Sequence, residues 1–167
     1  GLFGSAIQRR MGKGAVAAVA VLPVAGAFAV SVGVFLQLLG LAPARRVLLD
    51  VVWRWLAVGS LHVDVAFVAD PLSTTLLLVV TGIGGLIHLY STAYMREDEA
   101  YWRFFAYLNL FTFAMLVLVL ADNLLLMFVG WEGVGLCSWA LIGFWWREPV
   151  NTTAGNKAFI VNRIGDG

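Results

Sequence analysis

The chain has 167 residues, of which 61% are hydrophobic and only 13% are charged, and its mean hydropathy is +0.89. A soluble globular domain has about 25% charged residues, so this composition lies far outside the soluble range. The net charge of +1 provides no basic surface for nucleic acid, and the single cysteine excludes a disulfide framework and zinc or iron–sulfur clusters held by cysteines.

The uncharged runs are long enough to cross a membrane, which takes roughly 20 mainly apolar residues in a helix. We predict complete spans over residues 15–41, 71–95, 104–121 and 124–146, and the start of a truncated span over residues 156–167. The predicted fold is an all-α polytopic membrane protein, a transmembrane helix bundle. Because the chain begins with glycine and stops inside a helical pattern, we expect it to be part of a longer protein.

Residues 1–14 are too polar to span a membrane and carry Arg9, Arg10 and Lys13. The apolar run that follows is too long for the core of a signal peptide. We therefore interpret this stretch as a basic segment at the inner side of the membrane. Pro23 inside the first span is tolerable, because neighbouring helices can satisfy the backbone groups that it frees.

Residues 42–70 differ in character, because charges mix with aromatic and β-branched side chains. Polar and apolar positions partly alternate from His62 to Val68, which favours a strand, and Gly59-Ser60 suits a turn. We predict a short β-hairpin outside the membrane. Asp70-Pro71 then begins the second span, since aspartate can cap a helix and proline is favoured at its first position.

The remaining boundaries follow from charged and aromatic clusters. We expect an inner loop over residues 96–103 and a tight turn at Asp122-Asn123, where one of the two residues caps the next helix. Trp145-Trp146 suits the opposite membrane boundary, and Glu148-Pro149 is expected to stop that helix. Residues 147–155 are then predicted to form a second inner loop.

The basic residues of the loops indicate the orientation, because cytoplasmic loops carry an excess of lysine and arginine. One side of the predicted bundle has seven such residues and the other has three, partly balanced by aspartates. The seven are Arg9, Arg10, Lys13, Arg96, Arg103, Arg147 and Lys157, and the three are Arg45, Arg46 and Arg54. This difference places the start of the chain inside and the hairpin outside.

Glu132 interrupts the fourth run, within GWEGVGLC, close to mid-membrane. A charged side chain there costs roughly 2.5–3.5 kcal/mol on insertion scales, so such a residue is interpreted first as functional. We interpret Glu132 as a proton carrier; the alternative is a hydrogen bond to a neighbouring helix. Gly130, Gly133 and Gly135 permit either close helix approach or room for water. Cys137 is most simply a small packing residue.

The last run carries Arg163 and Asp166, which lie three residues apart on one helix face and can therefore pair. Opposite charges in an apolar helix indicate a polar path through the protein, with a structural ion pair as the alternative. His88 in the second span can titrate or can hydrogen-bond to a neighbouring helix, and the structural role is favoured for it alone. These groups fit a transporter, pump or channel.

The stretch LADNLLLMFVGWEGVGLCSWALIGFWW, with FFAYLNLF before it and KAFIVNRIGDG after it, closely resembles the L-type antiporter-like subunit of respiratory complex I, the proton-pumping NADH–quinone oxidoreductase. DPLS at 70–73 and IHLYSTAYMREDEAYWRFFAY at 87–107 match as well, so the resemblance is dense over residues 67–167. The large subunit of Mrp-type cation/proton antiporters shares the Trp-Glu pair but usually differs after it.

The resemblance implies roles for two acidic residues of the membrane-spanning runs. Glu132 would belong to the central proton-transfer axis and work with a lysine on a later helix. Asp166 of the RxGD motif would support that axis, and Arg163 and His88 are weaker supporting candidates.

The resemblance also implies a place in the cell and a set of partners. The chain would be a translocase subunit in a bacterial plasma membrane or mitochondrial inner membrane, beside other membrane subunits of complex I. It would hold no cofactor itself, because quinone reduction takes place elsewhere in the complex. The alternatives are a subunit of a Mrp-type antiporter and a non-pumping membrane segment.

Overall fold

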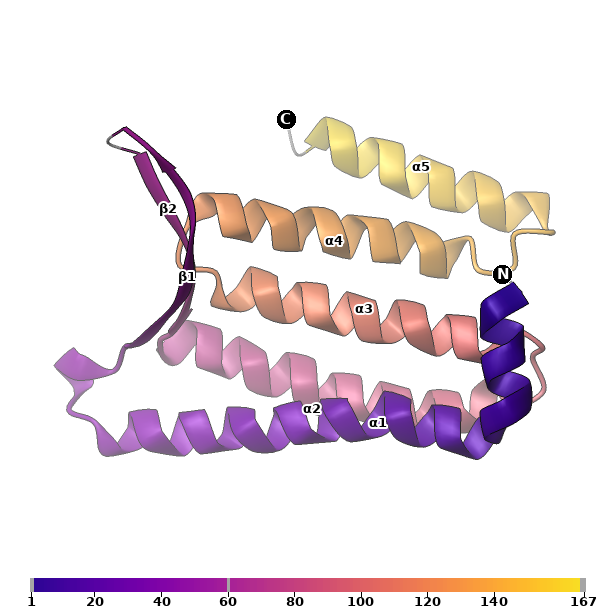
Figure 1. Ribbon diagram of the computed structural model, residues 1–167, viewed down its shortest axis with the longest axis horizontal. Coiled ribbons are helices and arrows are strands. Elements are labelled where there is room, and N and C mark those ends of the chain that lie inside the picture. The colour runs from indigo at the N-terminus through magenta and orange to yellow at the C-terminus, as the bar shows by residue number, and fades with distance from the viewer. Residues whose placement is uncertain (1, 60, 166–167) are drawn as a thin grey trace.

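The computed structural model describes residues 2–59 and 61–165, which form five α-helices and one two-stranded antiparallel sheet (Figure 1). The helices are α1 (Leu2–Gly40), α2 (Pro71–Tyr94), α3 (Tyr101–Leu120), α4 (Leu124–Ile142) and α5 (Pro149–Gly165), and the strands are β1 (Leu48–Val58) and β2 (Leu61–Ala69). Four of these helices contain a segment long and apolar enough to cross a membrane, in α1 from Gly12 to Gly40. The predicted helix bundle with a short β-hairpin is confirmed.

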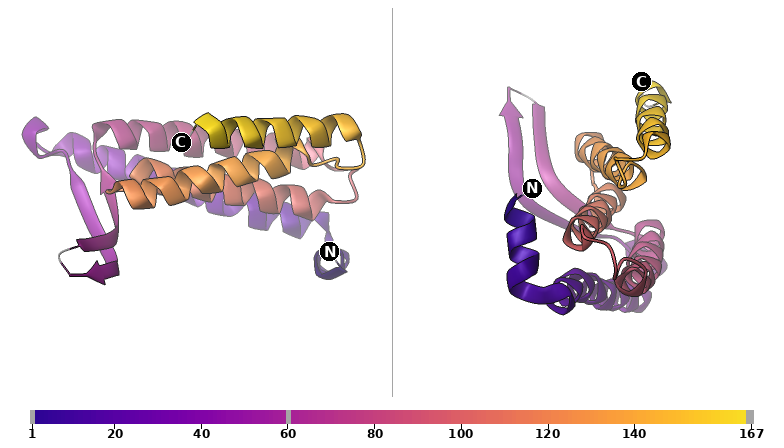
Figure 2. Two further views of the ribbon diagram at one scale, coloured as in Figure 1. Left: turned by 90° about the horizontal axis from the view of Figure 1, so that it is seen from above. Right: turned by 90° about the vertical axis from the view of Figure 1, so that its right-hand side faces the viewer.

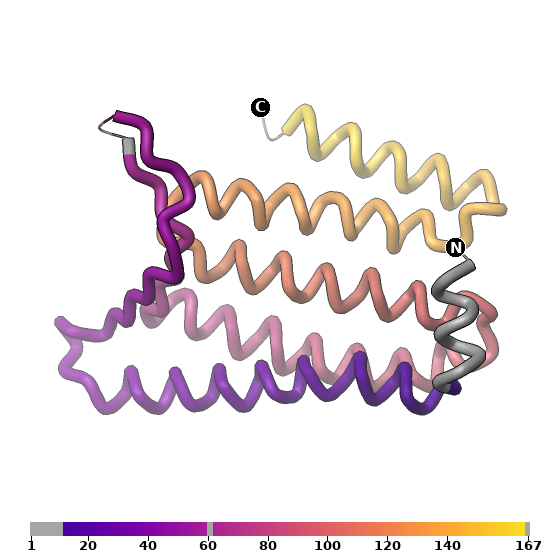
Figure 3. Tube along the Cα trace, in the orientation of Figure 1, coloured from indigo at the N-terminus to yellow at the C-terminus, as the bar shows by residue number. Residues whose placement is uncertain are grey.

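The helices lie side by side and reverse direction at each connection, as the ribbon and the Cα trace show (Figures 2 and 3). Helices α1, α2 and α3 contact one another in pairs, α4 packs on α3, and α5 packs on α4. Between 17% and 28% of each candidate span is buried within the chain. The remaining apolar surface faces outward, as expected for helices that lipid or further helices surround.

The two ends of the bundle differ in their connections. At one end, which we call the basic end, lie the loops of residues 95–100 and 143–148. Lys13 Nζ donates hydrogen bonds to the carbonyl oxygens of Arg96 and Asp98, so the start of the α1 span lies there too. The other end, the hairpin end, carries the sheet (Figure 1). The basic loops grouped from the sequence therefore gather at one end of the molecule.

Side-chain caps begin two of the helices at the hairpin end. Asp70 Oδ1 accepts from the Ser73 N–H at 2.7 Å, and Ser73 Oγ accepts from the Asp70 N–H at 2.8 Å, which is a reciprocal capping box. Asn123 Oδ1 accepts from the Leu126 N–H at 3.0 Å. Both predicted caps are confirmed, with Asn123 rather than Asp122 as the cap of α4.

The hairpin rests on the turn between α3 and α4 through its second strand. Val65 forms a buried cluster with Ala121 and Leu126, and Asn123 Nδ2 donates to the Asp64 carbonyl oxygen at 2.8 Å. In contrast, β1 is exposed from its second residue to its end. Gly59 has a φ of 61°, as a tight hairpin turn requires, whereas Ser60 of the predicted turn lies outside the described residues.

The predicted end of the fourth span at Trp146 is wrong. Helix α4 ends at Ile142, with Gly143 in the cap position; after it the helical spacing is lost, since the Phe144 N–H bonds to the Leu141 carbonyl oxygen three residues earlier at 3.3 Å. Trp145 and Trp146 therefore lie in the connecting loop and not in the helix.

The start of the last helix also differs from the prediction. Helix α5 begins at Pro149, seven residues before the expected residue 156, because proline suits the first turn of a helix as well as it stops one. Most of the predicted inner loop over residues 147–155 is therefore helical. Lys157, counted among the loop cations, lies within α5.

Glycines set the distance between α3 and α4. A Cβ atom on Gly130 would lie 2.6 Å from the backbone nitrogen of Leu118, and one on Gly133 would lie 3.0 Å from the Cβ of Ala114. Any side chain at Gly130 therefore collides with backbone atoms, which cannot rotate away. These two glycines serve close helix approach.

Gly130→Ala is expected to lower the thermal midpoint of the protein in its membrane assembly, because overpacking costs about 1–3 kcal/mol. Gly33→Ala in α1 is the matched control, since no atom lies within 4 Å of its added Cβ. Thermal unfolding in detergent, followed by an aggregation or fluorescence assay, measures both variants. Equal midpoints for the two would contradict the close approach of α3 and α4.

Candidate functional site

Glu132 lies near the middle of α4, and its carboxylate forms an ion pair with the guanidinium of Arg163 near the end of α5. Within the chain, 36% of the Glu132 side chain and 26% of the Arg163 side chain are exposed. The pair therefore lies in the seam between two neighbouring helices. The carboxylate has a cationic partner from this chain, which the sequence analysis did not predict.

The third glycine of the motif makes room for this pair. A Cβ atom on Gly135 would lie 2.6 Å from Nη2 of Arg163. Gly135 follows Glu132 by three residues, so both lie on the side of α4 that faces α5. The question left open by the sequence is thereby answered: Gly130 and Gly133 serve packing against α3, and Gly135 accommodates the arginine.

Helix α5 is held against α4 at several levels. Trp139 Nε1 donates a hydrogen bond to Asn156 Oδ1 at 3.0 Å. A Cβ on Gly155 would lie 3.4 Å from the carbonyl oxygen of Trp139, so the two backbones approach closely there. Further along α5, the guanidinium of Arg163 lies 5.1 Å from the ring centre of Phe159, a cation–π contact. These contacts bring Arg163 to the level of Glu132.

Asp166 lies outside the described residues, so its predicted pairing with Arg163 and its role beside Glu132 stay predictions. Among the described residues, Arg163 forms an ion pair with Glu132 and a cation–π contact with Phe159.

His88 lies apart from the ion pair. It is fully buried on α2, and its ring lies 6.4 Å from that of Phe105 on α3, the helix between α2 and α4 (Figure 1). Nδ1 lies 2.7 Å from the carbonyl oxygen of Gly84, which can only accept, so Nδ1 carries a proton. Nε2 has no hydrogen-bond partner in the part of the chain that the structure describes. The predicted bond to a neighbouring helix is thus a bond within α2, and a role in proton transfer stays a prediction.

Besides His88, two fully buried polar residues on α2 escaped the sequence analysis. Thr74 and Thr81 are both fully buried, and with His88 they repeat at intervals of seven residues. Thr81 Oγ1 donates to the Leu77 carbonyl oxygen at 2.6 Å and lies 3.4 Å from Ser31 Oγ on α1. The seven-residue spacing was the available signal, because it places residues on one helix face.

Two protein-family models match the chain. Residues 55–105 match "NADH-Ubiquinone oxidoreductase (complex I), chain 5 N-terminus", and residues 121–167 match "NADH:quinone oxidoreductase/Mrp antiporter, TM". The second segment contains both members of the ion pair.

Several curated relatives carry the name NADH-quinone oxidoreductase subunit L. The protein of Escherichia coli (strain K12) is 59% identical over 114 residues, which is 68% of this chain and 19% of that protein. The protein of Mycobacterium tuberculosis (strain CDC 1551 / Oshkosh) is 48% identical over 140 residues, or 84% of this chain and 22% of the relative. The Neisseria meningitidis protein is 40% identical over 168 residues, which is 99% of this chain and 24% of that protein. The chain thus spans between 19% and 24% of the length of these relatives.

A solved structure has the same fold. A chain in the structure of the Mrp complex from Dietzia sp. DQ12-45-1b matches with a TM-score of 0.74 and 24% sequence identity. The match covers 98% of this chain and 16% of that one. At this identity the likeness shows the arrangement of the helices and the hairpin alone.

The ion pair can be tested with a double-mutant cycle of Glu132→Gln and Arg163→Gln. Each single variant leaves one charge in the α4–α5 seam without its counterpart, so each should destabilise the protein more than the pair of changes together. We expect a coupling energy of about 0.5–3 kcal/mol, measured from the denaturation of the protein in its membrane assembly. Additive effects would show that the two side chains do not interact.

Proposed function

The chain belongs to the subunit L family of NADH-quinone oxidoreductase, the chain 5 proteins of complex I, and from this we propose that it is a proton-translocating, antiporter-like membrane subunit of such an enzyme. It is a multi-pass integral membrane protein with four candidate spans among its described helices. The observation that carries the proposal is the ion pair of Glu132 and Arg163 in the seam between α4 and α5. The carboxylate can be ionised or protonated, while the guanidinium beside it keeps its charge. The pair, placed between apolar helices, therefore has two charge states.

The chemistry of the pair assigns the moving proton to Glu132. Arginine remains charged in proteins and supplies no proton, so Arg163 acts as an electrostatic partner. Next to it, the ionised carboxylate is stabilised by the opposite charge. When the guanidinium moves away, a lone carboxylate in the membrane costs roughly 2.5–3.5 kcal/mol, and uptake of a proton removes that cost.

Asp166 offers Arg163 an alternative partner in this scheme. It follows Arg163 by three residues, a spacing that places two side chains on one face of a helix. An exchange of the guanidinium between Glu132 and Asp166 would keep it beside a carboxylate throughout while Glu132 loads and releases its proton. We assign Asp166 and Arg163 to control of the charge on Glu132, and His88 to a supporting role.

The energy for this exchange would come from outside the chain. We propose that quinone reduction elsewhere in the complex biases the position of Arg163 through neighbouring membrane subunits, and that this chain itself holds no redox cofactor. Two discrete arrangements of one ion pair are the kind of element through which distant sites can be coupled. The support for these partners is the family of the chain, since its relatives are named as subunits of NADH-quinone oxidoreductase.

Glu132→Gln removes the titratable group and keeps the shape of the side chain. A positioned proton-transfer group contributes about a hundredfold or more in rate, so we expect NADH-driven proton pumping to fall at least tenfold in the assembled complex. Proton uptake by inverted membrane vesicles, measured against NADH oxidation and against the amount of assembled complex, checks this. Glu97→Gln, in the exposed loop at the basic end, is the control and should pump normally.

Three outcomes would contradict the proposal in different ways. Normal pumping with Glu132→Gln would make Glu132 a structural contact. Failure of the complex to assemble with Glu132→Gln would also contradict the proposal, because it would show that Glu132 is needed for folding or assembly. Sodium-dependent transport that continues without NADH oxidation would instead identify a cation/proton antiporter subunit.

A further inference from the structure

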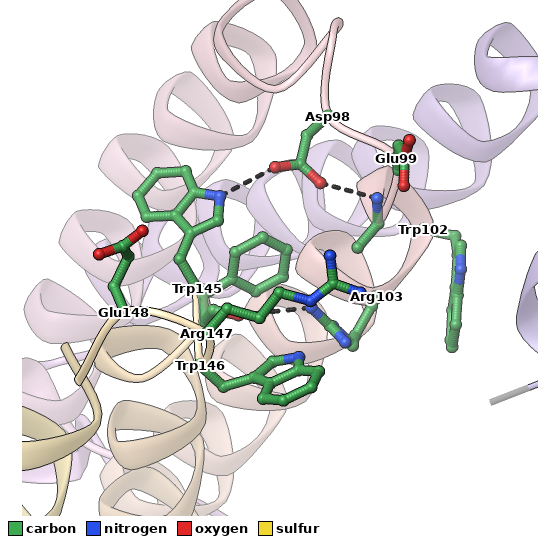
Figure 4. A pocket seen from close by; sticks show the side chains of 10 residues that line it. Asp98, Glu99, Trp102, Arg103, Trp145, Trp146, Arg147 and Glu148 are labelled. Carbon is green, nitrogen blue, oxygen red and sulfur yellow. Dashed lines mark hydrogen bonds between the residues drawn. The ribbon is translucent and has the colours of Figure 1, made fainter.

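A cavity of about 570 Å³ opens at the basic end of the bundle, between the loop that follows α2 and the loop that follows α4 (Figure 4). We propose that it binds the headgroup of a zwitterionic aminophospholipid, one with a phosphate and a primary ammonium group, whose acyl chain enters an adjoining apolar slot. The proposal is independent of proton translocation, because it requires only that this end of the helices meets the surface of the membrane.

Two arginines in the lining provide the phosphate site. Arg103 Nη2 donates to the Phe144 carbonyl oxygen at 3.3 Å, and its guanidinium lies 4.8 Å from the centre of the Phe144 ring. The guanidinium of Arg147 lies 5.5 Å from the ring centre of Trp146. Guanidinium groups bind phosphate through paired N–H donors, and stacking on a ring leaves their edges available for such bonds.

A carboxylate in the same lining provides the ammonium site. Asp98 is already engaged, since Oδ1 accepts from the Ala100 N–H at 2.7 Å and Oδ2 accepts from Trp145 Nε1 at 2.9 Å (Figure 4). Glu99 is exposed at the cavity next to Asp98 and can accept hydrogen bonds from an ammonium group, whereas Glu148 lies on the opposite side, beyond Trp145 (Figure 4).

The balance of charge selects a zwitterion over an anion. The lining holds two guanidinium groups and three carboxylates, so it has one net negative charge. A headgroup with only negative charge would bring that charge towards these carboxylates. A headgroup with both charges can place its phosphate at the arginines and its ammonium at Glu99.

The shape of the cavity selects a lipid over a free phosphate compound. A second cavity of about 210 Å³ shares Arg103, Phe144 and Trp146 with the first and continues along the helices to Tyr107 and Ala140. Tyr107 follows Arg103 by four residues and Ala140 precedes Phe144 by four, so this slot extends about one helical turn into the membrane-spanning part. A polar site joined to an apolar slot matches a headgroup joined to an acyl chain.

The aromatic side chains agree with a position at the membrane surface. Trp102, Trp145 and Trp146 all line the first cavity, and tryptophan is enriched where hydrocarbon meets the headgroups. Helices α2, α3, α4 and α5 all have an end at this level.

The test uses the protein in its assembled membrane complex, reconstituted with a phosphatidylethanolamine that carries a photoactivatable group next to its headgroup. Mass spectrometry of the cross-linked peptides should locate labelling at residues 98–103 and 144–148. Unlabelled phosphatidylethanolamine should compete at about tenfold lower amounts than phosphatidylglycerol or phosphatidylcholine, because loss of one charged hydrogen bond weakens binding by about that factor. Labelling elsewhere only, or equal competition by the three lipids, would overturn the proposal.

Variants identify the groups responsible. Arg147 is exposed, so Arg147→Gln should leave the fold intact and lower the labelling about tenfold. The exposed Arg45 at the hairpin end is the matched control, and Arg45→Gln should label normally. Glu99→Gln should shift the preference towards phosphatidylglycerol. An unchanged preference, or an equal loss of labelling in Arg45→Gln, would overturn the assignment of these groups.

Discussion

The structure around Glu132 is arranged so as to offset the free-energy cost of placing a carboxylate between membrane helices. Glu132 can lie in the seam of α4 and α5 because the Arg163 guanidinium meets it there. That contact requires α5 to approach α4 closely, and Gly135 and Gly155 provide the space on the two helices. Two requirements therefore act on the sequence around Glu132: a cation must meet the carboxylate, and small residues must let α5 approach α4.

The spacing within the GWEGVG motif connects three helices through six residues of α4. Gly130 and Gly133 face α3, while Glu132 and Gly135 face α5. With 3.6 residues per turn, two interleaved pairs at three-residue spacing occupy different faces of the same helix. Helix α4 therefore packs closely against α3 on one face, where Gly130 lets its backbone approach Leu118, and contacts the charge of Arg163 on the other face.

The spans could be predicted because an uncharged run of some twenty residues has few structural alternatives. Glu132 could be singled out because a lone charge in such a run is expensive. The partner of Arg163 could not be predicted, since Asp166 is visible three residues away in sequence whereas Glu132 becomes a neighbour only through the packing of α5 on α4. The start of α5 was predicted wrongly because a proline such as Pro149 can either end one helix or begin the next. Thr74 and Thr81 were overlooked because each has an ordinary place in an apolar helix and only their common spacing with His88 marks them.

Helix α5 packs on α4, and its connection to α4 passes through Gly143 and ends at Pro149 (Figure 1). Arg163 follows Pro149 by fourteen residues, which places it about 21 Å from that connection at 1.5 Å per residue. A tilt of α5 about this connection therefore moves Arg163 further than it moves the residues near Pro149. A tilt of about five degrees at this connection displaces the guanidinium by about 2 Å, enough to separate an ion pair from direct contact. A small tilt of α5 at its connection to α4 thus becomes a larger displacement at Arg163.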